Sequence, residues 1–529
     1  MSNDVYNIHD ALKTSLKDYI ITYLRRSPVL LEALKEKLDD KGILFQEPYI
    51  ESSAEYKKID NWVADTNIPD WMKDFFSHLI QDNLGVYSSS FKHQILALEN
   101  AVAGKNLFVS TGTGSGKTEC FIWPLIAKLV REAHDTPKIW EKRGVRCIIM
   151  YPMNALVSDQ ISRLRRLIGD TNGDFITHFR SATGQDIRRP QFGMYTGRTP
   201  YPGKKPKKEE DKSLAKTLQR IVNGGANTYI SELTKQGRIP AKQSLSSFVT
   251  YLQQGNHQTD PDDAELITRF EMQQKTPDIL ITNYSMLEYM LFRPHERSIW
   301  MDTRAWLNSS QSNRLLFVID EAHMYKGASG GEVALLLRRL FHKLGISYER
   351  VQFILTTASM PDDNDNDKEA VQKFANCLTA SDENSFCYLK GTKKEIPDVC
   401  NEIPTEHIAN FSAQEFLENE ELTTNLNRFW KPYQNGNSFN SIEEAEEWLF
   451  DNLIKYNPFR QLMVSCRGVA VSLSELASSI FPNDTSEKGL SIICTLLSIL
   501  SLAKKKWEYL IPNTCSYVIP WYRGDFRMF

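Results

Sequence analysis

A glycine-rich loop at residues 109–118, VSTGTGSGKT, is the stretch best suited to chemistry in this chain. An apolar run, NLFVS, enters it, and a helical run that begins TECFIWPL follows it. Spaced glycines let such a loop curl so that its backbone N–H groups converge on phosphate oxygens. Thr111 stands where the strict pattern has glycine. The residues expected to hold the phosphates are Thr113, Gly114, Ser115, Gly116, Lys117 and Thr118.

Two side chains at the end of this loop carry defined roles in phosphate loops. Lys117 supplies a positive charge to the β- and γ-phosphates, and the Thr118 hydroxyl is placed to ligate Mg²⁺. The loop therefore predicts a nucleoside triphosphate with Mg²⁺ as the ligand.

A second candidate site is the acidic pair in LLFVIDEAH, where Asp320 and Glu321 end a fully apolar run. Ionised carboxylates beside such a run are costly unless a cation accompanies them, so the pair indicates a Mg²⁺ site. Asp320 is expected to hold Mg²⁺ through water, and Glu321 to orient or deprotonate the attacking water. His323 is the group expected to pass the nucleotide state on to a second ligand.

The elements that position these residues form an alternating pattern from about residue 91. Apolar, strand-like runs separated by helical stretches predict an α/β fold with a parallel sheet covered on both faces. In such sheets, ligands bind at the carboxyl ends of the strands. The runs are NLFVS, RCIIMYP, DILITN, LLFVID and QFILTTAS.

The sequence predicts three parts. Residues 1–86 form a helical accessory domain, residues 87–402 the phosphate-loop lobe with an insert at about 199–275, and residues 403–529 a helical region. SLSELASSIF and GLSIICTLLSILSLA in the last part could be helices of a winged-helix module, which either binds duplex or only packs. The basic run KKPKK is either a surface loop or a nucleic-acid contact.

Composition excludes several other classes. The chain has 529 residues and a net charge of −3, so contact with a polyanion must be local. None of its eight cysteines forms a C-x-x-C pair, so neither a zinc ribbon nor a redox motif is indicated, and the scattered thiols fit a reducing cytoplasm. The start resembles no signal peptide, and the apolar run at 490–503 is too short to span a membrane.

These motifs resemble those of superfamily-two DEAH-box helicases, whose first RecA-like lobe carries them in this order. The resemblance implies ATP and Mg²⁺ as cofactors and nucleic acid as a partner. It makes Gln94 in FKHQ an adenine reader, and Thr357 and Ser359 in TTAS a coupling motif. The residues implied to contact the nucleic-acid backbone are Pro152 and Asn154 in YPMNALVSDQ, Arg198 in YTGR, and Thr282 and Asn283 in PDILITNYSML.

A finer resemblance follows the acidic pair. DEAHMYKGASGGEVALLLRRL is similar to the group with the MrfA-type repair helicases and the DISARM and Druantia anti-phage helicases. This resemblance implies 3′-to-5′ translocation on single-stranded DNA, with defence-complex proteins as partners. The alternative, from another class, is an ATP-switched assembly or sensing module that does not unwind processively.

One departure from the family is expected to matter. The Q-x-x-G-R-x-x-R-like motif of a second RecA-like lobe does not occur in this sequence. The second lobe, with its arginine, is therefore expected from the rest of a longer polypeptide or from another subunit. Loss of such an arginine costs about 10³–10⁵ in rate, so the chain alone is expected to hydrolyse ATP poorly.

Overall fold

The computed structural model divides the chain into two compact units, residues 56–392 and residues 1–55 with 393–529. Each is described by itself. The residues that the structure describes are 5–23, 28–40, 43, 49–52, 56–112, 115–170, 172–201, 208–223, 232–358, 365–382, 385–392, 441–466, 469–483, 486–505, 508–509 and 526–528.

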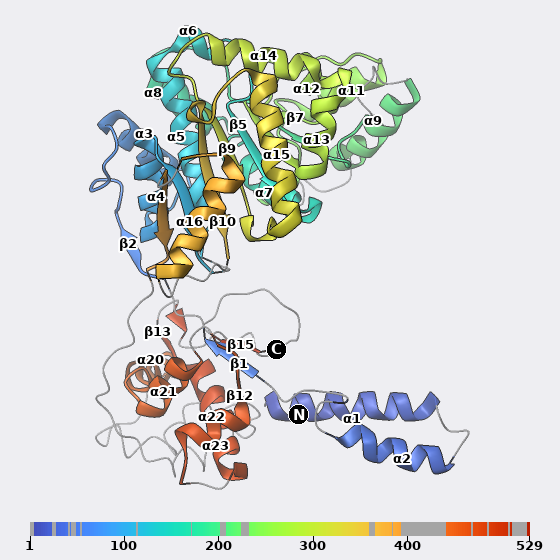
Figure 1. The fold of residues 1–529 in the computed structure, drawn as a ribbon, viewed down its shortest axis with the longest axis vertical. Helices are drawn as coiled ribbons and strands as arrows, with labels where there is room; N and C mark the ends of the chain where they lie inside the picture. Colours follow the sequence, from blue (N-terminus) through green and yellow to red (C-terminus); the bar gives the residue numbers. More distant parts are fainter. Residues whose placement is uncertain are drawn as a thin grey trace. The chain divides into compact units, whose positions relative to one another are not determined.

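The first unit, residues 56–392, is built on an eight-stranded sheet in which every pairing is parallel (Figure 1). The strand order is β11-β4-β10-β9-β5-β8-β6-β7. The strands are β4 (Asn106–Ser110), β5 (Cys147–Tyr151), β6 (Phe192–Tyr195), β7 (Glu265–Leu266), β8 (Ile279–Asn283), β9 (Leu315–Ile319), β10 (Val351–Thr357) and β11 (Phe386–Lys390). All five predicted runs are strands of this sheet, so the predicted α/β fold is confirmed.

Helices cover both faces of the sheet. Successive residues of a strand point to opposite sides, so each apolar strand contributes side chains to a core on either face. In β9, for example, Leu316 and Val318 belong to one core cluster, whereas Leu315, Phe317 and Ile319 belong to the other. The first cluster takes in α3 (Asp70–Gln81), α4 (Lys92–Val102), α5 (Glu119–Asp135), α7 (Asn154–Leu167) and α8 (Asp174–Thr183). The second takes in α13 (Tyr284–Phe292), α14 (Arg297–Asn308), α15 (Gly327–Leu344) and α16 (Asp365–Thr379).

The compact unit begins at Tyr56, about thirty residues before the predicted lobe boundary. The physical reason is that Trp62, Phe75 and Phe76 are buried in the core cluster of the sheet. Trp62 stacks on Trp123 of α5 with ring centroids 5.1 Å apart, and Phe75 meets Phe175 of α8 edge-on. The apolar periodicity of residues 71–79 predicts a helix, but it does not say which core receives the apolar face.

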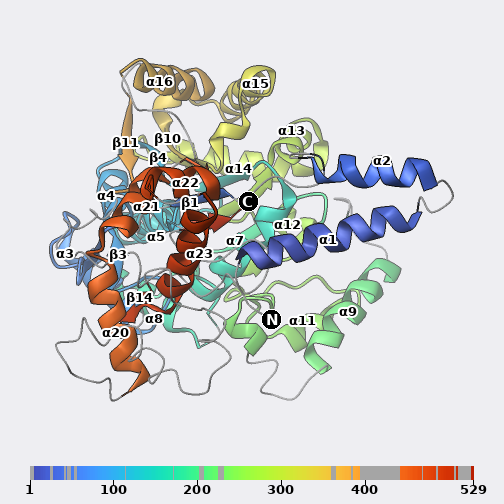
Figure 2. The ribbon, with the colours of Figure 1, turned by 90° about the horizontal axis from the view of Figure 1, so that it is seen from below.

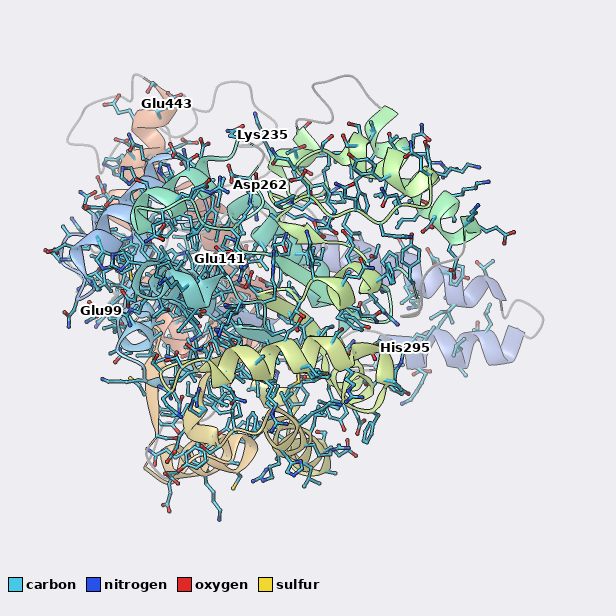
Figure 3. All side chains as sticks on the ribbon, turned by 90° about the horizontal axis from the view of Figure 1, so that it is seen from above. Glu99, Glu141, Lys235, Asp262, His295 and Glu443 are labelled. Carbon is cyan, nitrogen blue, oxygen red and sulfur yellow. The ribbon has the colours of Figure 1, made fainter. Side chains whose placement is uncertain are left out.

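The predicted insert contains α9 (Lys208–Asn223), α11 (Leu245–Gln253), β7 and α12 (Arg269–Gln274). Figure 2 shows α9 and α11 side by side, where they share a small core around Leu218, Phe248 and Leu252. The insert is also held to the lobe by charge. Arg180 of α8 pairs with Asp262, which is labelled in Figure 3, at 3.1 Å.

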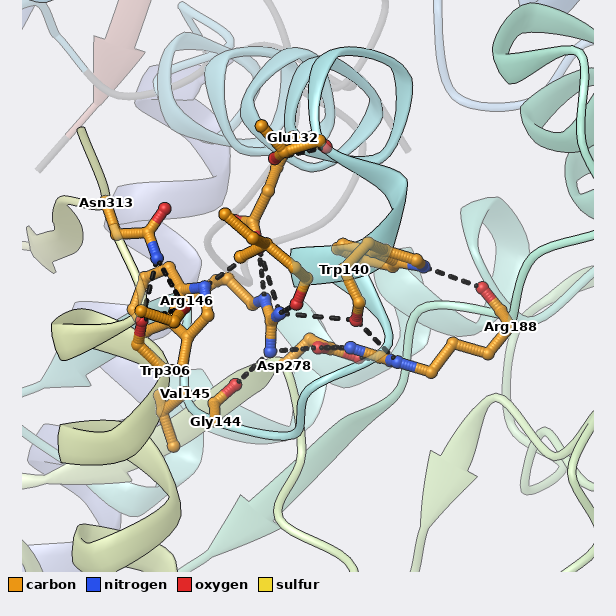
Figure 4. Close-up of polar contacts among 12 residues, drawn as sticks. Glu132, Trp140, Gly144, Val145, Arg146, Arg188, Asp278, Trp306 and Asn313 are labelled. Atoms are coloured by element: carbon orange, nitrogen blue, oxygen red, sulfur yellow. Dashed lines mark hydrogen bonds and ion pairs between the residues drawn. The ribbon is translucent and has the colours of Figure 1, made fainter. Parts of the chain in front are cut away.

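At the amino-terminal ends of β5 and β8 lies a buried polar network (Figure 4). The Asp278 carboxylate accepts from Arg188 Nη1 and Nη2 at 2.7 and 2.8 Å and pairs with Arg146 Nη1 at 3.1 Å. Arg146 also pairs with Glu132 of α5 at 2.9 Å. The two guanidinium groups lower the pKa of Asp278 against the opposing effect of its complete burial. This network joins strands to helix at the sheet edge opposite the phosphate loop.

The second unit combines helices with a three-stranded sheet of order β12-β1-β15. The strands are β1 (Tyr49–Ser52), β12 (Val471–Ser472) and β15 (Phe526–Met528), and β13 (Lys504–Lys505) pairs with β14 (Glu508–Tyr509). The helices are α1 (Val5–Tyr23), α2 (Pro28–Asp39), α20 (Ile442–Leu453), α21 (Asn457–Ser465), α22 (Leu473–Ile480) and α23 (Ser486–Leu502). No described helix of the chain is both long and apolar enough to cross a membrane.

The order of α21, β12, α22, α23 and the β13–β14 hairpin is that of the winged-helix module considered from sequence. Ile493, Leu496 and Leu500 of α23 are buried in the core of this unit, and the only basic residue of α23 is Lys488. Duplex binding by this module stays a prediction. The KKPKK run lies, except for its last residue, outside the described residues.

Candidate nucleotide and nucleic-acid site

The phosphate loop leaves β4 and enters α5, as the sequence predicts. Its root is tied to β10, since the Thr111 N–H donates to the Thr357 carbonyl at 3.1 Å. The buried Ser115 hydroxyl lies 2.7 Å from both the Thr111 hydroxyl and the Gly112 carbonyl. Gly116 has φ +70°, which favours glycine. Thr113 and Gly114 lie outside the described residues.

The structure brings Lys117 and Glu321 together although 204 positions separate them in sequence. Lys117 Nζ donates to Glu321 Oε1 at 2.9 Å. Glu321 has φ +51°, a conformation that non-glycine residues rarely adopt and that is frequent at functional sites. The strained backbone aims a carboxylate at the phosphate loop.

Asp320 directly follows β9, beside this pair, and is 7% exposed. Its Oδ1 accepts from the Thr356 hydroxyl and from the Glu321 N–H, the latter at 3.1 Å. Burial, with a contribution from the Glu321 charge, raises the pKa of Asp320. A bound cation would offset both the cost of burying the Asp320 carboxylate and its repulsion from Glu321.

The side chains around Asp320 fit a Mg²⁺ ion. Glu321 Oε2 is buried and has no hydrogen-bond partner among the residues that the structure describes, although His323 Nδ1 lies 3.3 Å away. Thr118 offers a hydroxyl oxygen that already accepts from Gln160 Nε2 of α7 at 3.2 Å. Carboxylate and hydroxyl oxygens are ligands that Mg²⁺ prefers. Thr118 and Asp320 are the residues that would hold the ion.

His323 lies between the acidic pair and β10. Its Nδ1 is 3.1 Å from the hydroxyl of Thr357, one of the two predicted coupling residues. Ser359, the other, lies outside the described residues. The contact links the acidic pair to the strand that also holds the root of the phosphate loop.

Gln94 is nearly buried against the phosphate loop. Its Nε2 donates to the Gly116 carbonyl at 3.1 Å, and its Oε1 accepts from the Phe91 N–H at 2.9 Å. The structure therefore brings Gln94 to the loop, while its reading of adenine stays a prediction.

The predicted nucleic-acid residues follow three neighbouring strands of the same sheet. Pro152 follows β5, Thr282 and Asn283 end β8, and Arg198 follows β6. Tyr151 pairs with Asn283, and Tyr195 with Thr282, so these strand ends lie at one edge. The strands that carry the nucleotide residues, β4, β10 and β9, adjoin them in the sheet order.

Their side chains differ in availability. Arg198 is exposed. Thr282 is buried and donates to the Tyr195 carbonyl at 2.8 Å, while Asn283 caps α13 by accepting from the Met286 N–H at 2.8 Å. The Thr282 and Asn283 side chains thus form hydrogen bonds that fix the backbone at this edge of the sheet. Asn154 begins α7, and its side chain lies outside what the structure describes.

Sequence reasoning missed several residues that hold the site. Tyr56 accepts from the Gly112 N–H at 2.8 Å, and His93 Nε2 lies 2.7 Å from the Ser115 carbonyl. Arg163 of α7 pairs with Glu119 at 2.6 Å. Arg269 of the insert donates to the Thr196 carbonyl at 2.7 Å and so supports the loop of Arg198. The FKHQ string contained His93 beside Gln94, but no spacing rule pointed to the others.

Comparison with known proteins identifies a family model over the part of the chain that carries the candidate site. The family model described as DEAD/DEAH box helicase matches residues 91–198 and 230–367. The chain therefore contains a DEAD/DEAH box helicase domain. Its interrupted match spans the phosphate loop and the acidic pair and omits part of the insert.

Among curated relatives, the Druantia protein DruE of Escherichia coli is 36% identical over 94% of this chain. The chain spans 29% of the length of that protein. An ATP-dependent helicase of Methanocaldococcus jannaschii is 27% identical over 22% of this chain and 15% of its own length. The solved structure of the DUF1998 helicase MrfA bound to DNA and AMPPNP matches with a TM-score of 0.34 and 14% identity, covering 80% of this chain and 43% of MrfA.

Proposed function

We propose that this chain carries the ATP-binding lobe of a nucleic-acid helicase or translocase that acts on DNA. The observation that carries the proposal is the Lys117–Glu321 contact at the carboxyl edge of the sheet, beside Asp320 and Thr118. In these roles Lys117 would bind phosphate, Glu321 would act as a base, and Asp320 and Thr118 would hold the metal, as suits a family whose members include ATP-dependent helicases.

Each residue has a distinct part in hydrolysis. Lys117 would exchange its contact with Glu321 for the β- and γ-phosphates. Glu321, released from that ion pair, would orient the attacking water or accept its proton. Asp320 and Thr118 would hold Mg²⁺, which when bound neutralises charge on the phosphates. The elevated pKa of Asp320 means that its ionised form gains from a bound cation.

Nucleic acid would lie along the adjoining strand ends, with Arg198 as the exposed cation. The His323–Thr357 contact supplies a route between the two halves of this edge. Single-stranded DNA is the favoured substrate. A second RecA-like lobe, from a longer polypeptide or another subunit, would add the arginine that accelerates hydrolysis.

ATP hydrolysis with and without single-stranded DNA tests the proposal, with the second lobe present and with Lys117→Ala and Glu321→Gln as controls. Stimulation by DNA that both variants abolish is the expected result. DNA binding with no effect on hydrolysis would refute it. Nucleotide-dependent complex formation without strand displacement would favour the assembly or sensing module.

We also propose a role in anti-phage defence, supported by the 36% identity with Druantia protein DruE. Cells carrying the intact gene with its neighbours should plate phage less efficiently than cells carrying Lys117→Ala. Equal plating would count against this role.

A further inference from the structure

The two points where the chain passes between the compact units lie next to each other in the unit that holds the phosphate loop. One point is before Tyr56, and the other is after Thr392. The Lys57 N–H donates to the Thr392 carbonyl at 2.8 Å, so the two crossings are joined by a hydrogen bond.

Tyr56 connects these crossings to the phosphate loop. Its hydroxyl accepts from the Gly112 N–H at 2.8 Å. Its ring packs on the backbone of Gly391, where an added Cβ would lie 2.0 Å from the Tyr56 Cε1 atom. One side chain therefore contacts the loop at one end and the chain crossing at the other.

His93 supports the same arrangement from α4. Its ring meets the Tyr56 ring edge-on with centroids 5.3 Å apart and stacks on Phe91. Burial lowers the pKa of His93, and its Nε2 donates to the Ser115 carbonyl at 2.7 Å. The loop is thus held at Gly112 and Ser115 by two adjacent rings, neither of which belongs to the phosphate-loop motif.

We propose that Tyr56 is a positioning residue for the phosphate loop, and that it couples nucleotide binding to the paired chain crossings at Tyr56 and Thr392. The inference rests on the proposed nucleotide site. Tyr56 holds Gly112, just after β4. The loop therefore loses less conformational entropy when its N–H groups converge on phosphate. A shift of Tyr56 then moves both crossings, because the hydrogen bond from Lys57 to Thr392 joins them.

Tyr56→Phe removes the hydroxyl and keeps the ring that packs on Gly391. Losing one hydrogen bond of ordinary strength should weaken ATP binding roughly threefold to tenfold. Tyr87→Phe is the matched control, because it deletes the same atom from a tyrosine that is 53% exposed. Dissociation constants for ATP and for adenosine are measured on the full chain. A loss for ATP but not for adenosine supports the proposal, and unchanged ATP affinity overturns it.

Gly391→Ala reaches the same side chain from the crossing, since the new methyl group must displace the Tyr56 ring. It should weaken ATP binding in the same direction. Hydrogen exchange supplies the readout that a merely structural role would not change. A non-hydrolysable ATP analogue should slow exchange of the Lys57 amide in the wild type and much less in Tyr56→Phe.

The outcomes separate this inference from the proposed function. If the wild type binds ATP, Lys117→Ala does not, and the Lys57 amide is unaffected by the analogue, the coupling is wrong while the nucleotide site stands. If the wild type binds no ATP, the nucleotide site itself is wrong, and the coupling falls with it.

Discussion

Asp278→Asn should be among the most destabilising single changes in the unit that holds the site. Asp278 is fully buried, and its two oxygens accept from Arg188 at 2.7 and 2.8 Å and from the Gln191 N–H at 2.9 Å. An asparagine keeps one acceptor oxygen but turns an NH₂ group toward donors. The substitution also leaves the Arg188 and Arg146 guanidinium groups with less compensating charge.

Removing one partner of a buried ion pair typically costs about 3–5 kcal/mol. Arg146 keeps Glu132, and Arg188 keeps the Trp140 carbonyl at 2.9 Å and ring at 4.4 Å, so we expect a cost near 3 kcal/mol. Asp262→Asn is the matched control, because its ion pair with Arg180 is partly exposed. Its cost should stay below about 1 kcal/mol.

Urea denaturation followed by tryptophan fluorescence measures this difference. Urea is uncharged and does not screen the ion pairs, and Trp140 and Trp306 both lie against Arg146. Because the pKa of Asp278 is lowered on folding, its contribution is present at neutral pH and is lost as the pH falls below the usual range of aspartate. A cost for Asp278→Asn no larger than that for Asp262→Asn would refute the reasoning.

Three further predictions concern the site. Asp320→Asn should raise the free energy of unfolding by about 0.5–2 kcal/mol at pH 7 while abolishing ATP hydrolysis. Burial raises the pKa of Asp320, so its ionised form costs stability above the unfolded pKa. Thermal unfolding and an ATPase assay check this prediction, and lower stability of the variant would contradict it. Arg198→Ala should weaken single-stranded DNA binding and reduce the salt slope by about 0.7–1, whereas an unchanged slope in a titration across salt concentrations would show that Arg198 contacts no phosphate. His323→Ala should keep ATP affinity and lose most of the stimulation of hydrolysis by DNA, and full stimulation would remove His323 from the coupling route.

Long apolar runs and the phosphate loop made the central sheet predictable from sequence. β4, β5, β8, β9 and β10 are buried on both faces and therefore appear as continuous Val- and Ile-rich runs. β6 and β7 are short, and β11 is only partly buried, so their apolar signal is weak. Their place in the sheet depends on long-range pairing that no local pattern encodes.

The residues of the candidate site also differ in how far they can be predicted from sequence. Lys117, Asp320 and Glu321 are predictable because phosphate and Mg²⁺ demand fixed residue types at fixed spacing. Tyr56 contacts the phosphate loop from 56 positions away, and Arg269 of the insert supports the loop of Arg198 through the Thr196 carbonyl. Neither contact leaves a spacing in the sequence, because each depends on how separate elements pack.

Nucleotide binding by Lys117→Ala and Glu321→Gln, compared with the wild type, tests the central claim most directly. The two side chains hold each other at 2.9 Å, yet the account gives them different tasks. Lys117→Ala should lose ATP affinity by at least about tenfold. Glu321→Gln should bind ATP as tightly as the wild type or tighter, because the Glu321 carboxylate no longer competes with phosphate for Lys117. The variant should nevertheless fail to hydrolyse ATP. Equal ATP affinity in all three proteins would contradict the assignment of this edge as a nucleotide site.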